Sequence, residues 1–284
     1  MYRKRFGLTG HPLPKNAQGK TFYEDSPAYR RLERAFRQLV DEPGVGLITG
    51  EPGVGKTAAL RNLCATLPKP DHLVLYLCDT AVSPLDLYRT LAQELGVAPS
   101  HRRGQLWTDI KKVLVHMVDE RHTQPVLVLD EAQHLSDRFL LDLSGFLNFA
   151  FDSRELLTLW LVGLPALGRT LAQQQHAPLA MRIQTHVHIE PCSDRDGFAA
   201  CIHAGLEAVG ARQKLLSDPA MELLFRQSRG YLRVASRLLR ASLRLAHERA
   251  QDFVDEHVLA AAVDDLLGPA LAAPPPGVAR SAKG

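Results

Sequence analysis

The sequence lacks a run of apolar residues long enough to cross a bilayer. Its longest nearly apolar stretch, residues 156–168, has 13 residues and includes Pro165, whereas a membrane-spanning helix needs about 20. The basic start, residues 1–5, is not followed by an apolar segment of signal-peptide length. We therefore expect a cytoplasmic protein that makes no membrane contact.

Cysteine is also scarce, with four in 284 residues, at positions 64, 78, 192 and 201. They form no CxxC pair and no Cys/His metal spacing, which argues against a disulfide framework and a zinc module and favours buried thiols in a reducing compartment. The sequence has 12 histidines. His186 and His188 share one face of a short predicted strand, but no carboxylate or cysteine cluster completes a metal site, so structural histidines are favoured.

The sequence is not depleted in hydrophobic residues, which make up 45% against 23% charged residues, and this excludes a mainly disordered or fibrous protein. The net charge is only +3. However, residues 1–40 hold nine Arg and Lys against three acids, and residues 226–249 hold seven Arg against one Glu. Such uneven charge points towards nucleic acid as a partner.

Short apolar runs alternate with helical patterns over the first two thirds of the chain. Strands are expected at 45–49, 73–77, 126–129 and 157–162, with a weaker one at 186–189. Helices are expected at about 27–40, 56–67, 84–95, 106–121 and 138–150. This alternation predicts an α/β fold with a parallel sheet that helices cover on both faces.

After residue 195 the strand signal stops and only helices are expected, at 195–209, 219–228, 231–249 and 255–267. The sequence therefore predicts a basic extension with a helix (1–42), an α/β nucleotide-binding core (43–191) and a small all-helical lid (192–268). The proline- and alanine-rich residues 269–284 are expected to be a disordered tail.

The strongest motif is a glycine-rich loop between a predicted strand and a predicted helix. Residues 50–57 read GEPGVGKT, which fits the phosphate-binding pattern GxxxxGK[ST]. Glycines let successive backbone N–H groups face a phosphate, and the helix N-terminus adds partial positive charge. Lys56 is expected to reach the β- and γ-phosphates of ATP, and the Thr57 hydroxyl to ligate Mg²⁺. The predicted ATP contacts are Gly50, Glu51, Pro52, Gly53, Val54, Gly55, Lys56, Thr57 and Ala58.

A second motif places two carboxylates after a buried strand. Residues 126–129 are all apolar, and Asp130 and Glu131 follow at the strand end where ligands bind in open α/β sheets. We expect Asp130 to hold the Mg²⁺ shell, and Glu131 to orient and deprotonate the attacking water. Glu131 favours a hydrolase over a kinase, because a kinase activates an organic acceptor instead of water.

With these motifs the chain resembles the AAA+ ATPases, and more narrowly the ExeA/TnsC/TniB/MuB group of P-loop ATPases. The matching segments are FGL at 6–8 with Phe22 and Tyr23, GEPGVGKT, LDEAQHL at 129–135, LVGLPAL at 161–167 and RGYLR at 229–233. Phe22 and Tyr23 could pack near the adenine or in the core.

The resemblance implies roles for two arginines. Arg182 matches the arginine finger that reaches the ATP of a neighbouring subunit, and Arg233 matches the lid arginine that senses the γ-phosphate. A guanidinium suits both roles because it is always charged and can bridge two phosphate oxygens. Either residue could instead be an ordinary surface arginine.

One position departs from the group. Relatives carry a polar side chain after the fourth strand, where it helps to position water, but this chain has Leu164. We expect nucleotide binding to be unaffected and hydrolysis to be slow.

Two basic regions are candidates for contact with DNA. In TnsC-like members the region that follows the helix of the second strand touches the DNA backbone, which implies Arg102, Arg103, Lys111 and Lys112 here. On the helix expected at 231–249, four arginines fall on one side, opposite Val234, Leu238, Ala241, Leu245 and Ala246: Arg233, Arg237, Arg240 and Arg244. Both regions could also be ordinary solvated surfaces.

The resemblance implies an ATP hydrolase that oligomerises with ATP on double-stranded DNA, as a ring or filament, independently of sequence. Its role would be to select a transposition target and recruit or activate a transposase or integrase. The alternatives are an ExeA-like secretion-associated ATPase and an ATP-driven signalling switch.

Overall fold

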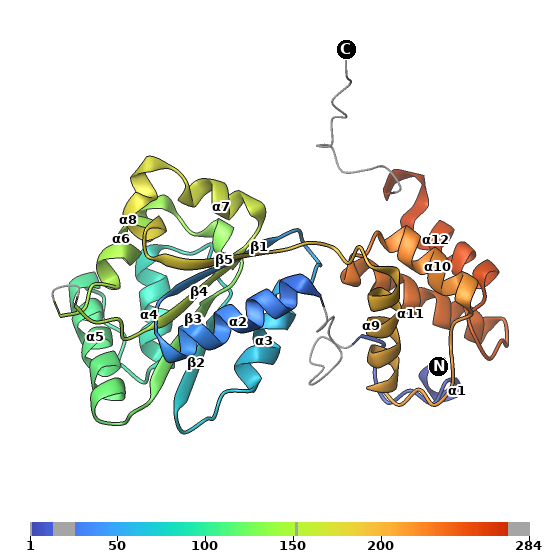
Figure 1. Ribbon diagram of the computed structural model, residues 1–284, viewed down its shortest axis with the longest axis horizontal. Helices are drawn as coiled ribbons and strands as arrows, with labels where there is room; N and C mark the ends of the chain where they lie inside the picture. Colours follow the sequence, from blue (N-terminus) through green and yellow to red (C-terminus); the bar gives the residue numbers. More distant parts are fainter. Residues whose placement is uncertain (1, 14–25, 151–152, 272–284) are drawn as a thin grey trace, which may run out of the picture. The chain divides into compact units, whose positions relative to one another are not determined.

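A computed structural model describes residues 2–13, 26–150 and 153–271 (Figure 1). Its centre is a five-stranded sheet made of β1 (Val45–Gly50), β2 (His72–Leu77), β3 (Gln124–Leu129), β4 (Thr158–Gly163) and β5 (Ile183–Ile189). The strand order is β2-β3-β4-β1-β5, and every paired strand runs parallel to its neighbour. The predicted parallel sheet is confirmed, and β5 is longer than its weak sequence signal suggested.

Helices cover both faces of the sheet, as expected. One face packs against α2 (Pro27–Asp41) and α3 (Lys56–Ala65). The other packs against α4 (Pro84–Glu94), α5 (Arg103–Asp119), α6 (Asp137–Phe146) and the short α7 (Pro165–Leu171) and α8 (Ala177–Ala180). Alternate residues of β3 point to opposite faces of the sheet. Val126 and Val128 pack in the core that α2 and α3 cover, and Leu127 and Leu129 pack in the core on the other face. A strand that is buried on both faces therefore reads as a continuous apolar run.

Serine caps explain where the helices of this unit begin. Ser26, Ser83 and Ser136 each accept a hydrogen bond from a backbone N–H in the first turn of α2, α4 and α6. Proline follows the cap in α2 and α4. At this first helical position a backbone N–H would have no partner within the helix, so proline, which lacks the N–H, costs no hydrogen bond. The short elements between β4 and β5, including the 3₁₀ turn η2 (Gln174–His176), have no comparable signal and escaped sequence analysis.

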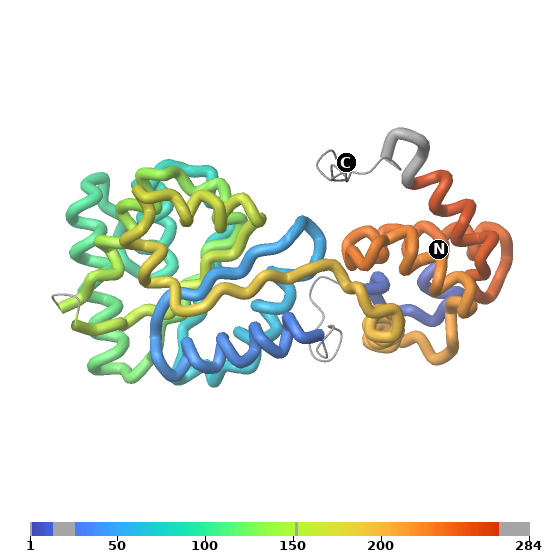
Figure 2. Tube along the Cα trace, turned by 45° about the horizontal axis from the view of Figure 1, so that its top comes forward, coloured from blue at the N-terminus to red at the C-terminus, as the bar shows by residue number. Residues whose placement is uncertain are grey.

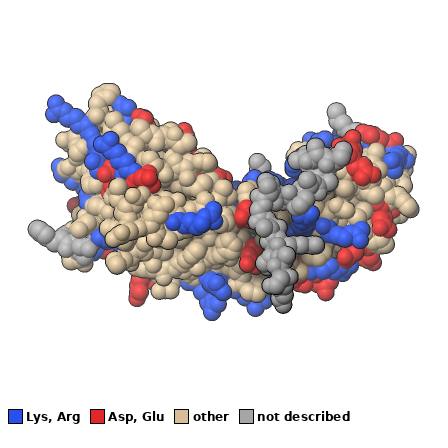
Figure 3. Space-filling view, turned by 90° about the horizontal axis from the view of Figure 1, so that it is seen from above, with Lys and Arg blue, Asp and Glu red and all other residues tan. Residues whose placement is uncertain are grey.

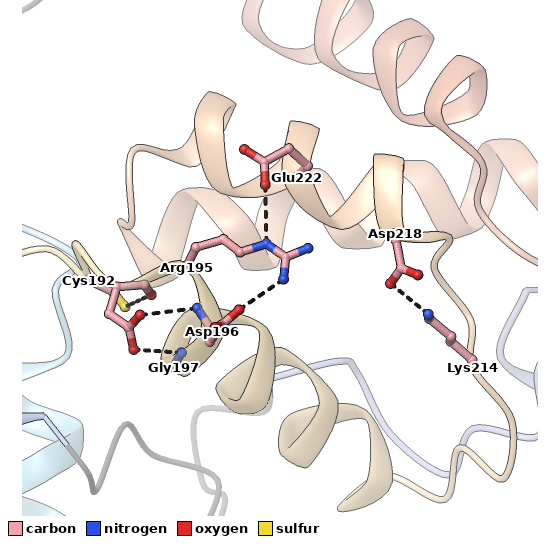
Figure 4. Close-up of polar contacts among 8 residues, drawn as sticks. Cys192, Arg195, Asp196, Gly197, Lys214, Asp218 and Glu222 are labelled. Atoms are coloured by element: carbon pink, nitrogen blue, oxygen red, sulfur yellow. Dashed lines mark hydrogen bonds and ion pairs between the residues drawn. The ribbon is translucent and has the colours of Figure 1, made fainter.

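The second unit is helical and consists mainly of α9 (Arg195–Glu207), α10 (Asp218–Ser228), α11 (Leu232–Glu248) and α12 (Glu256–Leu271). Figure 4 shows how its first helices are fixed. The Asp194 carboxylate caps α9 by accepting from the backbone N–H groups of Asp196 and Gly197. The Arg195 guanidinium then joins α9 to α10 through Glu222, at an N–O distance of 3.2 Å.

The chain's first residues belong to the helical unit, which differs from the predicted division at residue 42. The chain splits into residues 24–190 and residues 1–23 with 191–284. The apolar side chains of Tyr2, Phe6 and Leu8 are buried in the core of the helical unit, and the start of the chain lies among its helices (Figure 2). Helix α2 instead packs on the sheet. Residues 1–42, which were expected to form one extension, therefore belong to two different cores: the first residues to the helical unit, and α2 to the α/β unit.

The structure also bears on the predicted tail, the four cysteines and the absence of a membrane-spanning segment. The predicted tail overlaps α12, which continues to Leu271, and residues 272–284 lie outside the described part. All four cysteines are free thiols, but Cys78 is exposed, so the prediction of buried thiols is wrong for that residue. Among the described residues no helix is long and apolar enough to span a membrane.

Candidate nucleotide-binding site

The predicted phosphate-binding loop turns between β1 and α3 at the carboxyl edge of the sheet. Gly53 and Gly55 have φ angles of 87° and 107°, a backbone conformation that strains any residue with a Cβ. Gly55 also occupies the N-cap of α3 without a side-chain cap. The backbone N–H groups at the start of α3 can therefore turn towards an anion, as the sequence predicts.

Lys56 lies inside this loop and is 9% exposed. Its ammonium group donates to the carbonyl oxygens of Gly50 at 2.8 Å and Glu51 at 3.1 Å. The positive charge is thus held within the turn that would surround a phosphate.

Asp130 accepts hydrogen bonds from three directions. Its Oδ2 accepts from the hydroxyls of Thr57 at 2.7 Å and Tyr76 at 2.8 Å, and its Oδ1 accepts from the Glu131 N–H at 2.9 Å. Asp130 is 3% exposed. The predicted pair, Thr57 and Asp130, therefore meets, and it offers hard oxygen donors of the kind Mg²⁺ takes beside phosphates and water.

Tyr76 was missed by sequence analysis. Partial removal of the half-exposed side chain from solvent, and then the hydrogen bond to Asp130, raise the pKa of its phenol, so it stays a donor at neutral pH. The available signal was strand register: Tyr76 pairs with Val128 and Leu77 with Leu129. The end of β2 consequently lies beside the residue that follows β3.

Glu131 is exposed at the same edge. Its φ of 52° is left-handed, which costs a non-glycine residue about 1–2 kcal/mol. The Thr80 hydroxyl donates to its carbonyl oxygen at 2.8 Å, and the Gln133 amide donates to its Oε2 at 2.7 Å. Backbone and carboxylate are thus both held, and Gln133 was another residue that sequence analysis missed.

Arg182 lies at the opposite edge of the sheet. It directly precedes β5 and lines a small cavity with residues at the starts of β1 and β4, among them Gly44 and Val45 at β1 and Leu157 just before β4. The length of β5 separates it from the phosphate-binding loop, and seven residues of strand extend about 20 Å. Arg182 therefore does not reach the site of its own chain.

Arg233 belongs to the helical unit, where it is exposed in the first turn of α11. Arg237 and Arg244 are exposed on the same helix, and Arg240 is half-buried. The residues packed in the core are Ala235, Ser236, Leu238, Leu239, Ser242, Leu243 and Ala246. The predicted amphipathic pattern is confirmed, although Val234, Ala241 and Leu245 are only partly buried. Figure 3 shows acidic and basic side chains interspersed on the helical unit (right).

Of the four residues predicted to contact DNA, Arg102 is the N-cap of α5 and the other three lie on that helix, and two of the four are engaged within the protein. Arg103 pairs with Asp142 at 2.7 Å and lies over the Trp107 ring at 4.5 Å. Lys111 donates to the Asn148 carbonyl at 2.7 Å, and burial lowers its pKa. Arg102 and Lys112 are exposed.

His186 and His188 both face Thr49, whose hydroxyl oxygen lies 2.7 Å from His186 Nε2 and 2.9 Å from His188 Nδ1. Within the described residues no group of three or more His, Cys, Asp or Glu side chains could hold a metal ion. The two histidines therefore form a polar contact between β1 and β5. Phe22 and Tyr23 lie outside the described residues.

Comparisons with known proteins relate the chain to AAA-domain proteins. Residues 38–171 match the family model of an AAA domain. The chain is 29% identical over 252 residues to general secretion pathway protein A of Aeromonas hydrophila. That match covers 88% of this chain and 45% of the relative, so the chain spans less than half of that protein.

Solved structures share the fold at low sequence identity. Cdc6p from Pyrobaculum aerophilum has a TM-score of 0.70 and 17% identity, covering 94% of this chain and 71% of that one. Drosophila ORC bound to DNA has a TM-score of 0.69 and 18% identity, covering 95% and 66%.

Proposed function

We propose that this chain, whose residues 38–171 match the family model of an AAA domain, binds ATP with Mg²⁺ and hydrolyses it slowly as a molecular switch. The observation that carries the proposal is the meeting of Thr57 and Asp130 beside the loop that holds Lys56. Phosphate-binding amides, a buried lysine and a hydroxyl–carboxylate pair at one strand edge fit a nucleoside triphosphate.

Each residue has a defined task in this mechanism. The backbone amides at the start of α3 and the Lys56 ammonium neutralise the phosphates. Thr57 and Asp130 would hold Mg²⁺, which when bound offsets charge on the β- and γ-phosphates. Glu131 would accept a proton from the attacking water, because its carboxylate is exposed at the same edge as Asp130.

Two features of the structure affect the expected rate of ATP hydrolysis. Leu164 is the N-cap of α7 and directly follows β4, and its side chain offers no hydrogen bond to a water molecule. Arg182 lies too far from its own loop to stabilise charge there, so it would act on the ATP of a neighbouring copy. Hydrolysis is then slow in a single chain and faster in an oligomer, which suits a switch.

For the biological role we propose DNA-dependent assembly in transposition. The ATP-bound form would oligomerise on double-stranded DNA through phosphate contacts that do not depend on sequence, and would pass the target to a transposase. The exposed arginines of α11 and the likeness of the fold to an ORC bound to DNA support the DNA contact.

The second candidate is an ExeA-like ATPase associated with secretion. It is favoured by the similarity to general secretion pathway protein A, which extends over 88% of this chain. In this role ATP would control assembly with proteins of the cell envelope, and DNA affinity would be absent.

Calorimetry tests the nucleotide site. Purified protein should release or absorb heat with ATP and Mg²⁺, whereas Lys56→Ala should lose this signal while keeping its circular dichroism spectrum. No heat from the native protein would contradict the proposal.

DNA binding and partner capture separate the two roles. Anisotropy with labelled duplex DNA should show an affinity that falls steeply with salt if several phosphates are contacted. Capture with ATP-loaded Glu131→Gln protein should retain a transposase. A salt-independent or absent DNA signal, together with envelope proteins on the column, would favour the secretion role.

A further inference from the structure

We propose that Gln133 is a positioning residue, which holds the Glu131 carboxylate against the end of β4 in place of the polar side chain that position 164 lacks. The inference rests on the proposed function, in which Glu131 activates water. Gln133 lies within the LDEAQHL segment, but neither the motifs nor the comparisons assign a role to its side chain.

Both ends of the Gln133 amide are used in complementary ways. Its Nε2 donates to Glu131 Oε2 at 2.7 Å, and its Oε1 accepts from the Leu164 backbone N–H at 3.1 Å. An ionised carboxylate can only accept and a backbone N–H can only donate, so the amide has one orientation that satisfies both. The result is a bridge from Glu131, the second residue after β3, to Leu164, the first residue after β4.

Gly163 provides the space for this bridge. A Cβ at position 163 would lie 2.8 Å from Gln133 Oε1 and 3.3 Å from the Gln133 backbone nitrogen. The first distance is shorter than real contacts allow, so any side chain at 163 would push the amide away from Glu131. The absence of a side chain at Gly163 therefore allows the Gln133 amide to keep its position beside Glu131.

The bridge has a direct chemical consequence. With Oε2 held by Gln133 and the backbone held by Thr80, the Glu131 carboxylate cannot rotate freely, and its Oε1 has a defined direction in which to accept a proton. A general base works only when it lies within hydrogen-bond reach of that proton. Because Leu164 cannot bind water through its side chain, orientation of the carboxylate becomes the main local control of the water.

The test compares Gln133→Ala with wild type and with Gln93→Ala, which removes an exposed glutamine on α4. Loss of a hydrogen bond to a charged group should lower kcat for ATP hydrolysis about 10- to 100-fold, with the Kd for ATP and Mg²⁺ unchanged. Gln133→Glu should be at least as slow, because it replaces the donor with a like charge. The Gln93 variant should retain wild-type turnover.

Rescue separates positioning from folding. Leu164→Asn returns a polar side chain to the end of β4 at the N-cap of α7, a position that asparagine suits. In the Gln133→Ala background it should recover part of the lost kcat. In the Glu131→Gln background, Gln133→Ala should cause no further loss.

A second readout does not depend on hydrolysis. In ¹⁵N spectra of the nucleotide-free protein, the Gln133 side-chain amide signals should be shifted from their free positions and should move towards them in Glu131→Ala. Unshifted signals, or a Gln133→Ala enzyme with wild-type kcat, would overturn the inference while leaving the proposed function intact. Wild-type protein that binds no ATP would overturn both.

Discussion

The Thr57 hydroxyl donates to Asp130 Oδ2 over 2.7 Å, although 73 residues separate the two in the chain. Thr57 lies in the first turn of α3 and Asp130 directly follows β3, and the parallel sheet brings both to its carboxyl edge. The same edge holds the Tyr76 hydroxyl on Asp130 and the exposed Glu131 carboxylate.

Glu131→Gln should bind ATP as wild type does and should lose at least about 100-fold in turnover, because an amide cannot accept the proton of the attacking water. Steady-state phosphate release and calorimetry measure the two properties separately. Glu94→Gln, on the exposed end of α4, is the control and should leave both unchanged. A Glu131→Gln protein that hydrolyses ATP normally would contradict the assignment of the base.

Arg182→Ala should lose about 10³-fold in turnover if the residue acts as an arginine finger on a neighbouring copy. Lys56→Ala should also be inactive, because its own site cannot hold the triphosphate. When the two variants are mixed, the intact site of one lies beside the intact arginine of the other, so activity should return in proportion to mixed contacts. A mixture that stays inactive under assembling conditions would make Arg182 a structural residue.

On α5, neighbouring basic residues should behave differently. Arg103→Ala should lower the free energy of unfolding by about 1 kcal/mol, because it removes a partly exposed ion pair with Asp142 and a ring contact. Arg102→Ala and Lys112→Ala should leave stability unchanged and weaken DNA binding. Urea unfolding and anisotropy are the measurements, and equal DNA affinity in all variants would exclude this helix from the DNA surface.

Stability should fall as the pH falls below about 6.5, the ordinary pKa of histidine. Burial, and then the charge of His188, hold the pKa of His186 below its ordinary value in the folded protein. The unfolded chain therefore binds more protons in this range, and lowering the pH favours unfolding. The contribution is fully present above this range and is lost as the pH falls towards the folded pKa.

Urea titrations between pH 7.5 and 5 test this dependence. His186→Gln should flatten the decline in unfolding free energy relative to wild type. Identical slopes in the two proteins would show that the contact at Thr49 does not titrate in this range.

Much of the α/β unit could be predicted because its signals are local. Serine–proline pairs mark helix starts, apolar runs mark buried strands, and GEPGVGKT can form only a narrow set of turns. The meeting of Thr57 with Asp130 followed from strand topology. The place of Asp130 at a strand end could be predicted from the sequence, because the four residues before it, 126–129, are all apolar.

Tyr76 and Gln133 could not be predicted in the same way. Tyr76 reaches Asp130 only because β2 pairs with β3 in one particular register. Gln133 depends on a 3₁₀ turn, η1 (Ala132–His134), that points its amide at β4. Arg103 and Lys111 read as surface charges in the sequence, since their ring and carbonyl partners come from elsewhere in the fold.

The packing of Tyr2, Phe6 and Leu8 among helices that begin beyond residue 190 makes the helical unit discontinuous in sequence. A fragment starting at residue 191 would expose the apolar core residues that these three side chains cover, and would be prone to aggregate. Anyone isolating this unit for binding studies should therefore graft residues 2–13 onto its carboxyl end through a flexible linker, which amounts to a circular permutation.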